Sequence, residues 1–248
     1  MILQIFYRLN EINGMSESTS ISSLHQDIRV KVCGMTDIAQ LHELGDIGVQ
    51  FAGMIFYPRS PRFVLKTLTG DMVRRAKLKV YKVGVFVNAT YDEIINHVDN
   101  FGLDMVQLHG DETPRFCEQV SLYIQTIKAF RLGTNDNISW MIKDYKDCCD
   151  LFLFDTMGAG YGGTGKKFNW EVMHGLDIKK PFLLSGGIEA GDVEGIRAFT
   201  CQSVAKDLFA VDINSKFEIS SGVKDMEKVR EFFEKLNMKN SKVKSQNP

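Results

Sequence analysis

The sequence predicts an α/β protein folded as a single (β/α)8 TIM barrel, and three observations favour this class. From residue 28 onward, short β-branched or aromatic apolar runs alternate with longer segments of helical period. This strand–helix unit occurs eight times, within the roughly 220 residues that such a barrel needs. Polar or titratable residues directly follow the apolar runs. An open doubly wound sheet is the alternative, but it usually carries a glycine-rich loop after its first strand, whereas these glycines gather late.

The elements follow one another in a regular order. The predicted strands are residues 28–32, 51–56, 81–87, 105–108, 126–130, 151–154, 182–184 and 209–211. The predicted helices are residues 37–46, 67–78, 91–101, 113–121, 135–146, 169–174, 189–199 and 225–236. Three of them have recognisable starts: Thr36-Asp37, the capping box of Thr90 with Glu93, and Asn169.

The barrel is expected to occupy residues 28–237, with extra chain at both ends. Residues 1–27 are predicted to form an N-terminal extension, in which the Ser/Thr-rich segment 16–23 is a flexible link. Met15 is a plausible alternative start. Residues 238–248 form a polar tail that we expect to be frayed.

Composition excludes several classes of function. The chain has 30 Lys+Arg and 31 Asp+Glu, and without a basic stripe on the predicted barrel we expect no binding to nucleic acid. No run approaches the ~18 apolar residues of a membrane span, so we expect no membrane association. The N-terminus lacks a basic leading region and a small-residue cleavage site.

The five cysteines indicate a reducing environment. Their number is odd and their spacing does not repeat, which is unlike a secreted disulfide framework and favours a cytoplasmic location. The adjacent pair Cys148-Cys149 has neither CxxC spacing nor a nearby histidine, so we predict no metal site.

In such a barrel, functional groups gather at the C-terminal ends of the strands. The residues that follow the predicted strands are Cys33, 57–62, Asn88, His109, Arg131, Asp155, 185–187 and 212–215. Helix capping accounts for one or two such residues, but not for a thiol, an imidazole, an arginine and two carboxylates at one rim.

Two glycine- or serine-containing segments predict a phosphate site. Gly186 and Gly187 follow the seventh strand, and Asn214 and Ser215 follow the eighth. Small residues let backbone N–H groups approach an anion, and barrels often bind phosphate at this place. The alternative is a pair of tight turns.

Three further side chains are candidates for substrate chemistry. Asp155 ends a strand before a glycine-rich loop, 156–168, that is typical of a lid, so it is a candidate general acid or a helix cap. His109 is either catalytic or a hydrogen-bonding rim histidine. Arg62 lies in a proline-containing turn and suits a ligand carboxylate; the alternative is that Arg62, like Arg59 of the same loop, faces solvent.

Cys33 ends the first predicted strand and therefore faces the same mouth as Asp155. Gly34 leaves room for a ligand, and the N–H groups that open the next helix are expected to stabilise a thiolate. Catalysis by this thiol is one interpretation. The other is a small buried cysteine, the commonest environment of that residue.

Several stretches together resemble one family. They are KVCGMT (31–36), FYPRSPRF, VGVFVN, VQLHGDE, LFDT, YGGTGKKFNW, LLSGGI and AVDINS with SGVKD, and they span about residues 29–236 in the family's order. On these motifs the chain resembles the phosphoribosylanthranilate isomerase family of tryptophan biosynthesis.

The resemblance implies an aldose–ketose isomerase that performs an Amadori rearrangement of N-(5-phosphoribosyl)anthranilate. It implies Asp155 as general acid, Cys33 as general base, and Arg62 as the partner of the anthranilate carboxylate. Carried over in the same way, Asp212 hydrogen-bonds the sugar or the amine, and His109 matches a rim histidine whose role stays open. Residues Gly186, Gly187 and Ser215 would hold the phosphate.

The same resemblance implies a small phosphorylated substrate and neither a metal nor an organic cofactor. We expect a monomer or a homodimer. The chain departs from the family in two places: Lys216 follows Ser215 where the family commonly has glycine, and residues 1–27 are additional.

Other functions remain as alternatives at this point. Indole-glycerol-phosphate synthase is expected to offer a lysine acid near the rim, and a histidine-pathway isomerase to carry aspartate after the first strand. A non-catalytic phospholigand-binding barrel would keep the glycines and lose the acid and base, so Cys33 and Asp155 together argue against it.

Overall fold

The computed structural model describes residues 28–133, 136–156 and 170–238. In this part of the chain, eight parallel strands close into a barrel in sequence order, with β1 paired to both β2 and β8. The strands are β1 (Arg29–Val32), β2 (Phe51–Ile55), β3 (Tyr81–Phe86), β4 (Met105–Leu108), β5 (Thr126–Leu132), β6 (Leu151–Thr156), β7 (Phe182–Leu184) and β8 (Leu208–Ile213). The predicted (β/α)8 barrel is confirmed. The expected extension 1–27, almost all of the expected tail, the loop 157–168 and Asn169 lie outside the described residues.

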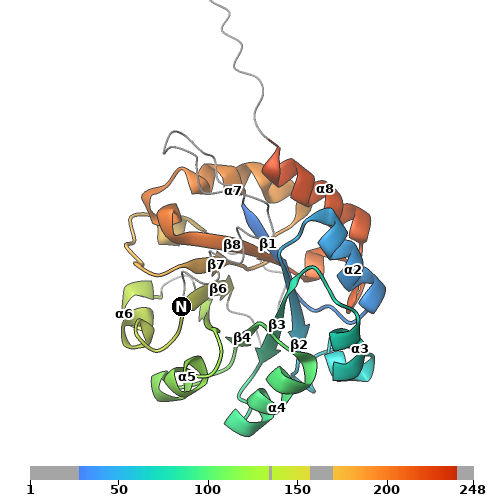
Figure 1. Cartoon of the computed structure of the whole chain (residues 1–248). Helices are drawn as coiled ribbons and strands as arrows, with labels where there is room; N and C mark the ends of the chain where they lie inside the picture. Colours follow the sequence, from blue (N-terminus) through green and yellow to red (C-terminus); the bar gives the residue numbers. More distant parts are fainter. Residues whose placement is uncertain (1–27, 134–135, 157–169, 239–248) are drawn as a thin grey trace, which may run out of the picture.

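The α-helices form a ring around the strands, as Figure 1 shows. They are α2 (Ile38–Ile47), α3 (Gly70–Arg75), α4 (Tyr91–Phe101), α5 (Pro114–Ser121), α6 (Ile138–Ile142), α7 (Val193–Thr200) and α8 (Met226–Asn237). Short 3-10 helices extend or replace some of them: η1 (Val64–Lys66), η2 (Lys143–Tyr145), η3 (Trp170–Met173), η4 (Ala190–Asp192), η5 (Ser203–Asp207) and η6 (Ser215–Phe217). The sixth predicted helix, 169–174, is the 3-10 helix η3 over its described residues.

Two of the predicted helix starts are confirmed by their capping bonds. The Asp37 side chain accepts a hydrogen bond from the Gln40 N–H at 2.9 Å. Thr90 and Glu93 form a capping box, in which the Thr90 N–H donates to Glu93 at 2.8 Å and the Glu93 N–H donates to Thr90 at 3.3 Å. These bonds satisfy N–H groups that no helical carbonyl can reach.

Strand alternation divides the apolar residues into two cores. One set of strand side chains fills the inside of the barrel, and it includes Phe51, Val83, Met105, Ile127, Leu153 and Leu183. The residues between them face outward and pack against the helices, as Val30 and Val32 do with Leu41, Val229 and Phe232. Successive side chains of a strand point to opposite faces, so each strand serves both layers.

A hairpin that the sequence did not predict follows the last barrel strand. It consists of β9 (Glu218–Ser220) and β10 (Val223–Lys224), paired antiparallel. Gly222 makes the turn at φ 88°, where a side chain would be strained. Its carbonyl accepts a hydrogen bond from the Thr36 hydroxyl at 2.6 Å, so the hairpin is fastened to the loop that follows β1.

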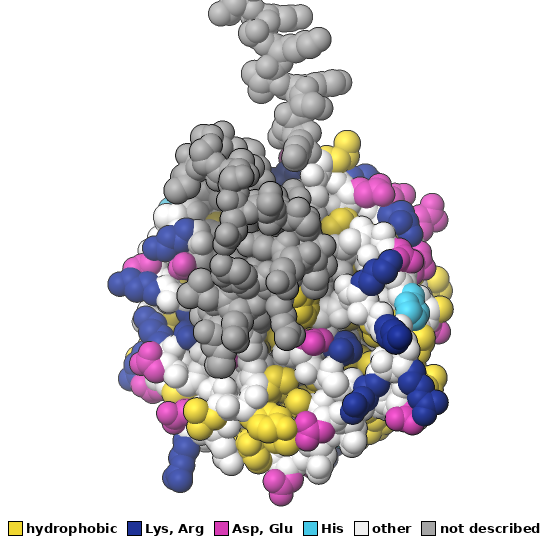
Figure 2. Space-filling view, viewed as in Figure 1, with side chains coloured by type: hydrophobic (Ala, Val, Ile, Leu, Met, Phe, Trp, Pro, Cys, Tyr) yellow, Lys and Arg dark blue, Asp and Glu magenta, His cyan; other side chains and the backbone are white. Residues whose placement is uncertain are grey.

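The charges on the visible surface are mixed. Figure 2 shows basic and acidic side chains interspersed around the outline of the molecule. None of the helices in the described ranges is long and apolar enough to cross a lipid bilayer.

Candidate active site

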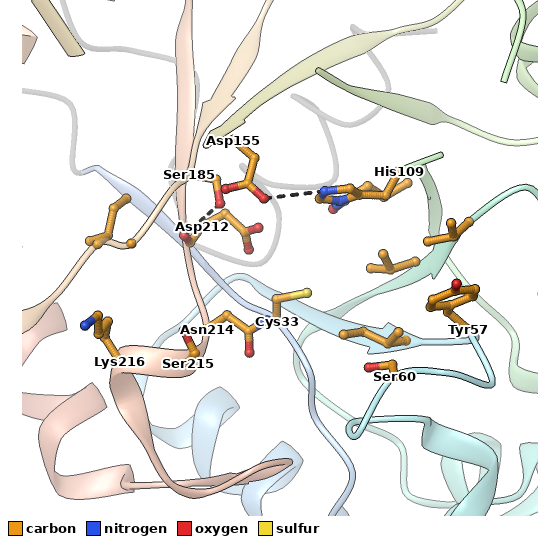
Figure 3. Close-up of a pocket in the computed structure, with 16 residues that line it drawn as sticks. Cys33, Tyr57, Ser60, His109, Asp155, Ser185, Asp212, Asn214, Ser215 and Lys216 are labelled. Atoms are coloured by element: carbon orange, nitrogen blue, oxygen red, sulfur yellow. Dashed lines mark hydrogen bonds and ion pairs between the residues drawn. The ribbon is translucent and has the colours of Figure 1, made fainter. Parts of the chain in front are cut away.

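A cavity opens at the C-terminal ends of the strands (Figure 3). Its lining residues are Cys33, Ile55, Tyr57, Ser60, Val85, Val87, Gln107, His109, Asp155, Ser185, Gly187, Ile188, Asp212, Asn214, Ser215 and Lys216. Titratable groups from five different strands or strand ends (β1, β2, β4, β6 and β8) therefore meet at one place, with a group of aliphatic side chains from β2 and β3 beside them. The expectation that Cys33, His109, Asp155 and Asp212 share one rim agrees with this arrangement.

Cys33 reaches the cavity because of the alternation along β1. Val30 and Val32 face the helices, so Lys31 and Cys33 face the interior of the barrel. The Cys33 N–H donates to the carbonyl of Ile213 at 2.9 Å, which extends the pairing with β8 by one residue. Gly53 of β2 provides the space for the thiol, because a Cβ at Gly53 would lie 2.9 Å from Cys33 Sγ.

Charges on neighbouring strands set the electrostatic environment of this thiol. Burial raises the pKa of Cys33 above its ordinary value, and the positive charge of the nearby Lys31 ammonium opposes that rise. The Asp212 carboxylate adds to the rise. The sequence suggested a pKa lowered by the next helix, whereas burial raises it. The helix α2 begins only at Ile38, and Asp37 caps its first turn.

Lys31 and Asp212 form a buried ion pair next to Cys33. The two residues are register partners on β1 and β8. Lys31 Nζ donates to Asp212 Oδ1 at 2.8 Å, and the two side chains are 0% and 6% exposed. Burial raises the pKa of the Asp212 carboxyl, while the ammonium of Lys31 holds it down.

Asp155 and His109 lie together on the opposite wall. His109 Nε2 is 3.4 Å from Asp155 Oδ2, the contact dashed in Figure 3. The other carboxylate oxygen of Asp155 accepts a hydrogen bond from the Thr156 N–H at 2.8 Å. The buried Gln107 amide lies 2.7 Å from His109 Nδ1. With the amide donating there, the ring proton is on Nε2, facing Asp155.

The ends of β7 and β8 form the part of the cavity that was predicted to bind phosphate. Gly186 and Gly187 have φ values of 96° and 68°, a conformation that glycine adopts without strain. Ser185, Gly187, Asn214 and Ser215 line the cavity, and Gly186 is adjacent to them in the chain. Ser215 begins η6, so its turn presents backbone N–H groups at this end.

Arg62 lies beside the cavity and is engaged with a carboxylate of its own chain. Its Nε donates to Glu218 Oε1 at 2.7 Å and its Nη2 donates to Glu218 Oε2 at 2.6 Å. A guanidinium carries five N–H groups, so three remain for other partners. The Arg62 side chain also passes close to the backbone of Gly34. A Cβ at Gly34 would lie 2.6 Å from Arg62 Cδ, so the glycine makes this close contact possible.

Two residues of the predicted rim serve the neighbouring loop instead. The Asn88 side chain accepts a hydrogen bond from the Asp111 N–H at 2.7 Å, and Arg131 Nη2 donates to Asp111 Oδ1 at 2.6 Å. Neither lines the cavity. They stabilise the segment that follows His109.

The sequence interpretation missed Lys31, Gln107, Glu218 and Lys224. Strand alternation was the available signal for Lys31 and Gln107, because each stands two residues before a predicted site residue and so shares its face. Glu218 and Lys224 belong to the unpredicted hairpin, where Lys224 Nζ donates to Glu218 Oε1 and to Asn214 Oδ1, each at 2.8 Å.

Comparisons with known proteins agree with the fold and identify the family. Residues 30–235 match the family model described as N-(5'phosphoribosyl)anthranilate (PRA) isomerase. The chain is 38% identical over 209 residues to N-(5'-phosphoribosyl)anthranilate isomerase of Parabacteroides distasonis, covering 84% of this chain and 92% of that protein. It is 34% identical over 211 residues to the enzyme of the same name from Phocaeicola vulgatus, covering 85% and 98%.

Solved structures of the same name share the architecture. The crystal structure of phosphoribosyl anthranilate isomerase from Thermotoga maritima superimposes with a TM-score of 0.72 at 29% identity, covering 84% of this chain and 98% of that one. A structure of the isomerase in complex with reduced 1-(o-carboxyphenylamino)-1-deoxyribulose 5-phosphate matches with a TM-score of 0.67 at 27% identity, with the same coverage. The family model covers nearly the whole barrel and close relatives exceed 30% identity, so this chain belongs to the N-(5'-phosphoribosyl)anthranilate isomerase family.

Proposed function

We propose that this chain converts N-(5-phosphoribosyl)anthranilate to 1-(2-carboxyphenylamino)-1-deoxyribulose 5-phosphate in tryptophan biosynthesis, with Asp155 as general acid and Cys33 as general base. The observation that carries the proposal is the placement of these two groups. They come from β6 and β1, which are well separated around the barrel, and both face one cavity (Figure 3). An Amadori rearrangement needs such a donor and acceptor of protons around one sugar.

The first step belongs to Asp155. Its carboxyl proton moves to the ribose ring oxygen while the bond from that oxygen to C1′ breaks, and the nitrogen lone pair forms the C=N bond of a protonated Schiff base. The Thr156 N–H holds one carboxylate oxygen and His109 lies near the other. These contacts fix the direction of the carboxyl group and support the carboxylate that remains after transfer.

The second step belongs to Cys33. Its thiolate takes the proton from C2′, and the electrons of the broken C–H bond form the C1′=C2′ bond of an enolamine as the C=N bond returns to a single bond. The enolamine then tautomerises to the ketone. Each proton transfer of this kind is typically worth about 10²- to 10⁴-fold in rate. The overall change oxidises C2′ and reduces C1′ within one molecule, so neither step calls for an external oxidant or reductant.

The remaining cavity residues bind and orient the substrate. The segment with Gly186, Gly187, Asn214 and Ser215 holds the phosphate through backbone N–H groups. Arg62 uses N–H groups not taken by Glu218 to hold the anthranilate carboxylate. Substrate binding through two anions at opposite ends fixes the sugar between the acid and the base. Among the further groups, His109 and Asp212 contact the sugar or the amine.

Turnover of N-(5-phosphoribosyl)anthranilate, followed by its fluorescence, tests this proposal. We expect wild type to turn over, and Cys33→Ser and Asp155→Asn each to lose at least about 10²-fold in kcat while still binding product. Cys201→Ser is the matched control, since this exposed cysteine lies outside the cavity. We expect it to keep full activity.

Three results would contradict the proposal. Full activity of Cys33→Ser would exclude the thiol as the base, and full activity of Asp155→Asn would exclude the carboxyl as the acid. A wild-type protein that binds substrate without turnover would favour a phospholigand-binding barrel.

A further inference from the structure

Lys31 is a charged residue that lies just outside the cavity and has no contact with solvent. It is fully buried, and it does not line the cavity that Cys33 and Asp212 line. Its ammonium donates to Asp212 Oδ1 at 2.8 Å. It also stands two residues before Cys33 on the inner face of β1, and its charge acts on the thiol. One cation thus lies behind both of these cavity residues.

We propose that Lys31 is the positioning residue of Cys33: its ammonium, anchored by Asp212, supplies the fixed positive charge that supports the thiolate form of the base. This inference rests on the proposed role of Cys33. It concerns a group that substrate does not reach, so Lys31 acts through the thiol.

The strand geometry fixes the ammonium where the thiol needs it. Lys31 and Cys33 are two residues apart on β1, so their side chains share the inner face of the barrel. Asp212 is the register partner of Lys31 on β8. The lysine side chain is a flexible four-carbon stem. The hydrogen bond to Asp212 anchors its ammonium and prevents it from turning away from the Cys33 sulfur.

Stability alone does not account for this pair. Removing two charges from water is costly, and well-packed apolar residues of similar volume often replace a buried ion pair with equal or greater stability. The neighbouring side chains inside the barrel, among them Phe51 and Leu183, are apolar. An apolar side chain in place of Lys31 would continue that layer. A lysine at this position therefore indicates a need for its charge.

The other charged side chains around Cys33 influence its thiolate less than Lys31 does, or are paired with another residue. Asp212 opposes thiolate formation, whereas Lys224 of β10 favours it, and both influence Cys33 less than Lys31 does. Lys224 and Arg62 are also engaged with Glu218, which offsets their charge. Lys31 is thus the strongest support that charged side chains give to the thiolate.

The charge balance of the proposed step is simple. Before reaction the sulfur is a thiolate and Lys31 is an ammonium. The C2′ proton moves to sulfur as the C–H bond breaks, and Lys31 keeps its own protons throughout. Support for the thiolate increases the fraction of enzyme that is ready to accept the proton, and a base whose pKa lies near the working pH is the most effective.

Alkylation of Cys33 by iodoacetamide measures this effect without turnover. The rate at Cys33 is followed by mass spectrometry of its peptide as a function of pH, because only the thiolate reacts. The pH at which the alkylation rate is half of its maximum is the midpoint. In Lys31→Met we expect this midpoint to rise by about 1–3 pH units, the usual influence of an adjacent opposite charge. In Asp212→Asn we expect the opposite shift, since a neighbouring anion is lost.

Lys128→Met is the matched control. Lys128 is equally buried and pairs with the buried Glu112 at 2.7 Å, but it lies on the outer face of β5, away from the cavity. Its loss should disturb folding as much as the loss of Lys31. We expect no shift of the Cys33 midpoint.

Kinetics give a second readout. In Lys31→Met we expect kcat to fall about tenfold or more near pH 7, to recover as the pH rises above the new midpoint, and KM to change little. A residue that only held the fold together would lower activity equally at every pH.

If Lys31→Met does not fold, the double variant Lys31→Met/Asp212→Asn removes both charges and leaves no unpaired ion. We expect its midpoint to stay above that of wild type, because Lys31 influences the thiol more than Asp212 does. An unshifted alkylation midpoint in Lys31→Met, or in the double variant, overturns the inference. That result would not contradict the role of Cys33 as the base. Full activity of Cys33→Ser, in contrast, would contradict the proposed function but not the influence of Lys31 on the thiol.

Discussion

Arg62 and Glu218 join the loop after β2 to the hairpin after β8 through two parallel hydrogen bonds of 2.7 and 2.6 Å. Glu218 Oε1 also accepts from Lys224 Nζ at 2.8 Å, and Lys224 Nζ donates onward to Asn214 Oδ1 at 2.8 Å. One carboxylate therefore balances two cations, and the network ends at a residue of the proposed phosphate site. The same carboxylate fixes the direction of the Arg62 guanidinium.

Glu218→Gln is expected to destabilise the protein strongly. The Glu218 side chain is 5% exposed and Lys224 is 0% exposed, and removing one partner of a buried pair leaves uncompensated charge, at a cost of about 3–5 kcal/mol in the free energy of unfolding. Urea denaturation measures the change. Asp71→Asn is the control, since Asp71 and Arg75 are 80% and 83% exposed and their pair should be worth at most about 1 kcal/mol. Equal small effects of the two variants would contradict this prediction.

The contribution of Glu218 should also depend on pH in one direction. Burial favours the neutral carboxyl, but hydrogen bonds from Arg62 and then the charge of Lys224 outweigh it, and the pKa of Glu218 in the folded protein is lower than its ordinary 4.5. The unfolded chain therefore binds a proton more readily, so the stabilisation is complete above that ordinary value and is lost as the pH falls through the folded-state pKa. We expect the wild-type advantage over Glu218→Gln to be constant near neutral pH and to shrink below pH 4.5. If the stability difference between wild type and Glu218→Gln grew as the pH fell, the predicted direction of the pH dependence would be wrong.

Strand alternation and the rule for the C-terminal rim account for most of what the sequence predicted correctly. Cys33, His109, Asp155 and Asp212 stand at or near strand ends, and their positions follow from local pattern alone. Helix lengths were less accurate. The predicted helix 67–78 is α3, Gly70–Arg75, because Thr69 caps it and Lys77 has a left-handed backbone at φ 48°.

The partners of the site residues were harder to predict because they depend on contacts between distant segments. Lys31 meets Asp212 across 181 positions of sequence, and Arg62 meets Glu218 across 156. Neither pairing leaves a local signal, since a lysine within a strand or a glutamate after one is usually solvent-exposed. Once the strand register of the barrel is known, the pairing of Lys31 with Asp212 follows directly. The pairing of Arg62 with Glu218 also depends on the hairpin.

Gly53→Ala should lower kcat more than it changes KM. The new Cβ would lie 2.9 Å from Cys33 Sγ and 3.1 Å from Cys33 Cα, so the thiol and its backbone must move away from β2. A displacement of about 1 Å costs up to 10²-fold in rate when it disturbs a reacting group. Steady-state kinetics and a thermal melt of the same sample separate this effect from unfolding. Gly191→Ala is the control, because its Cβ would have no neighbour within 4 Å, and equal kcat in both variants would contradict the prediction.

Lys216→Gln should weaken binding of the substrate phosphate. Lys216 lines the cavity beside Ser215 (Figure 3), and no carboxylate of the described residues forms an ion pair with its ammonium. A charge-assisted hydrogen bond is worth about 1.5–3 kcal/mol, so we expect KM and the inhibition constant of inorganic phosphate to rise about tenfold or more. The difference from wild type should decrease as salt screens the charge. The matched variant Lys206→Gln removes an exposed lysine that pairs with Asp177 at 2.8 Å and should leave both constants unchanged. If Lys216→Gln also leaves them unchanged, backbone N–H groups alone hold the phosphate.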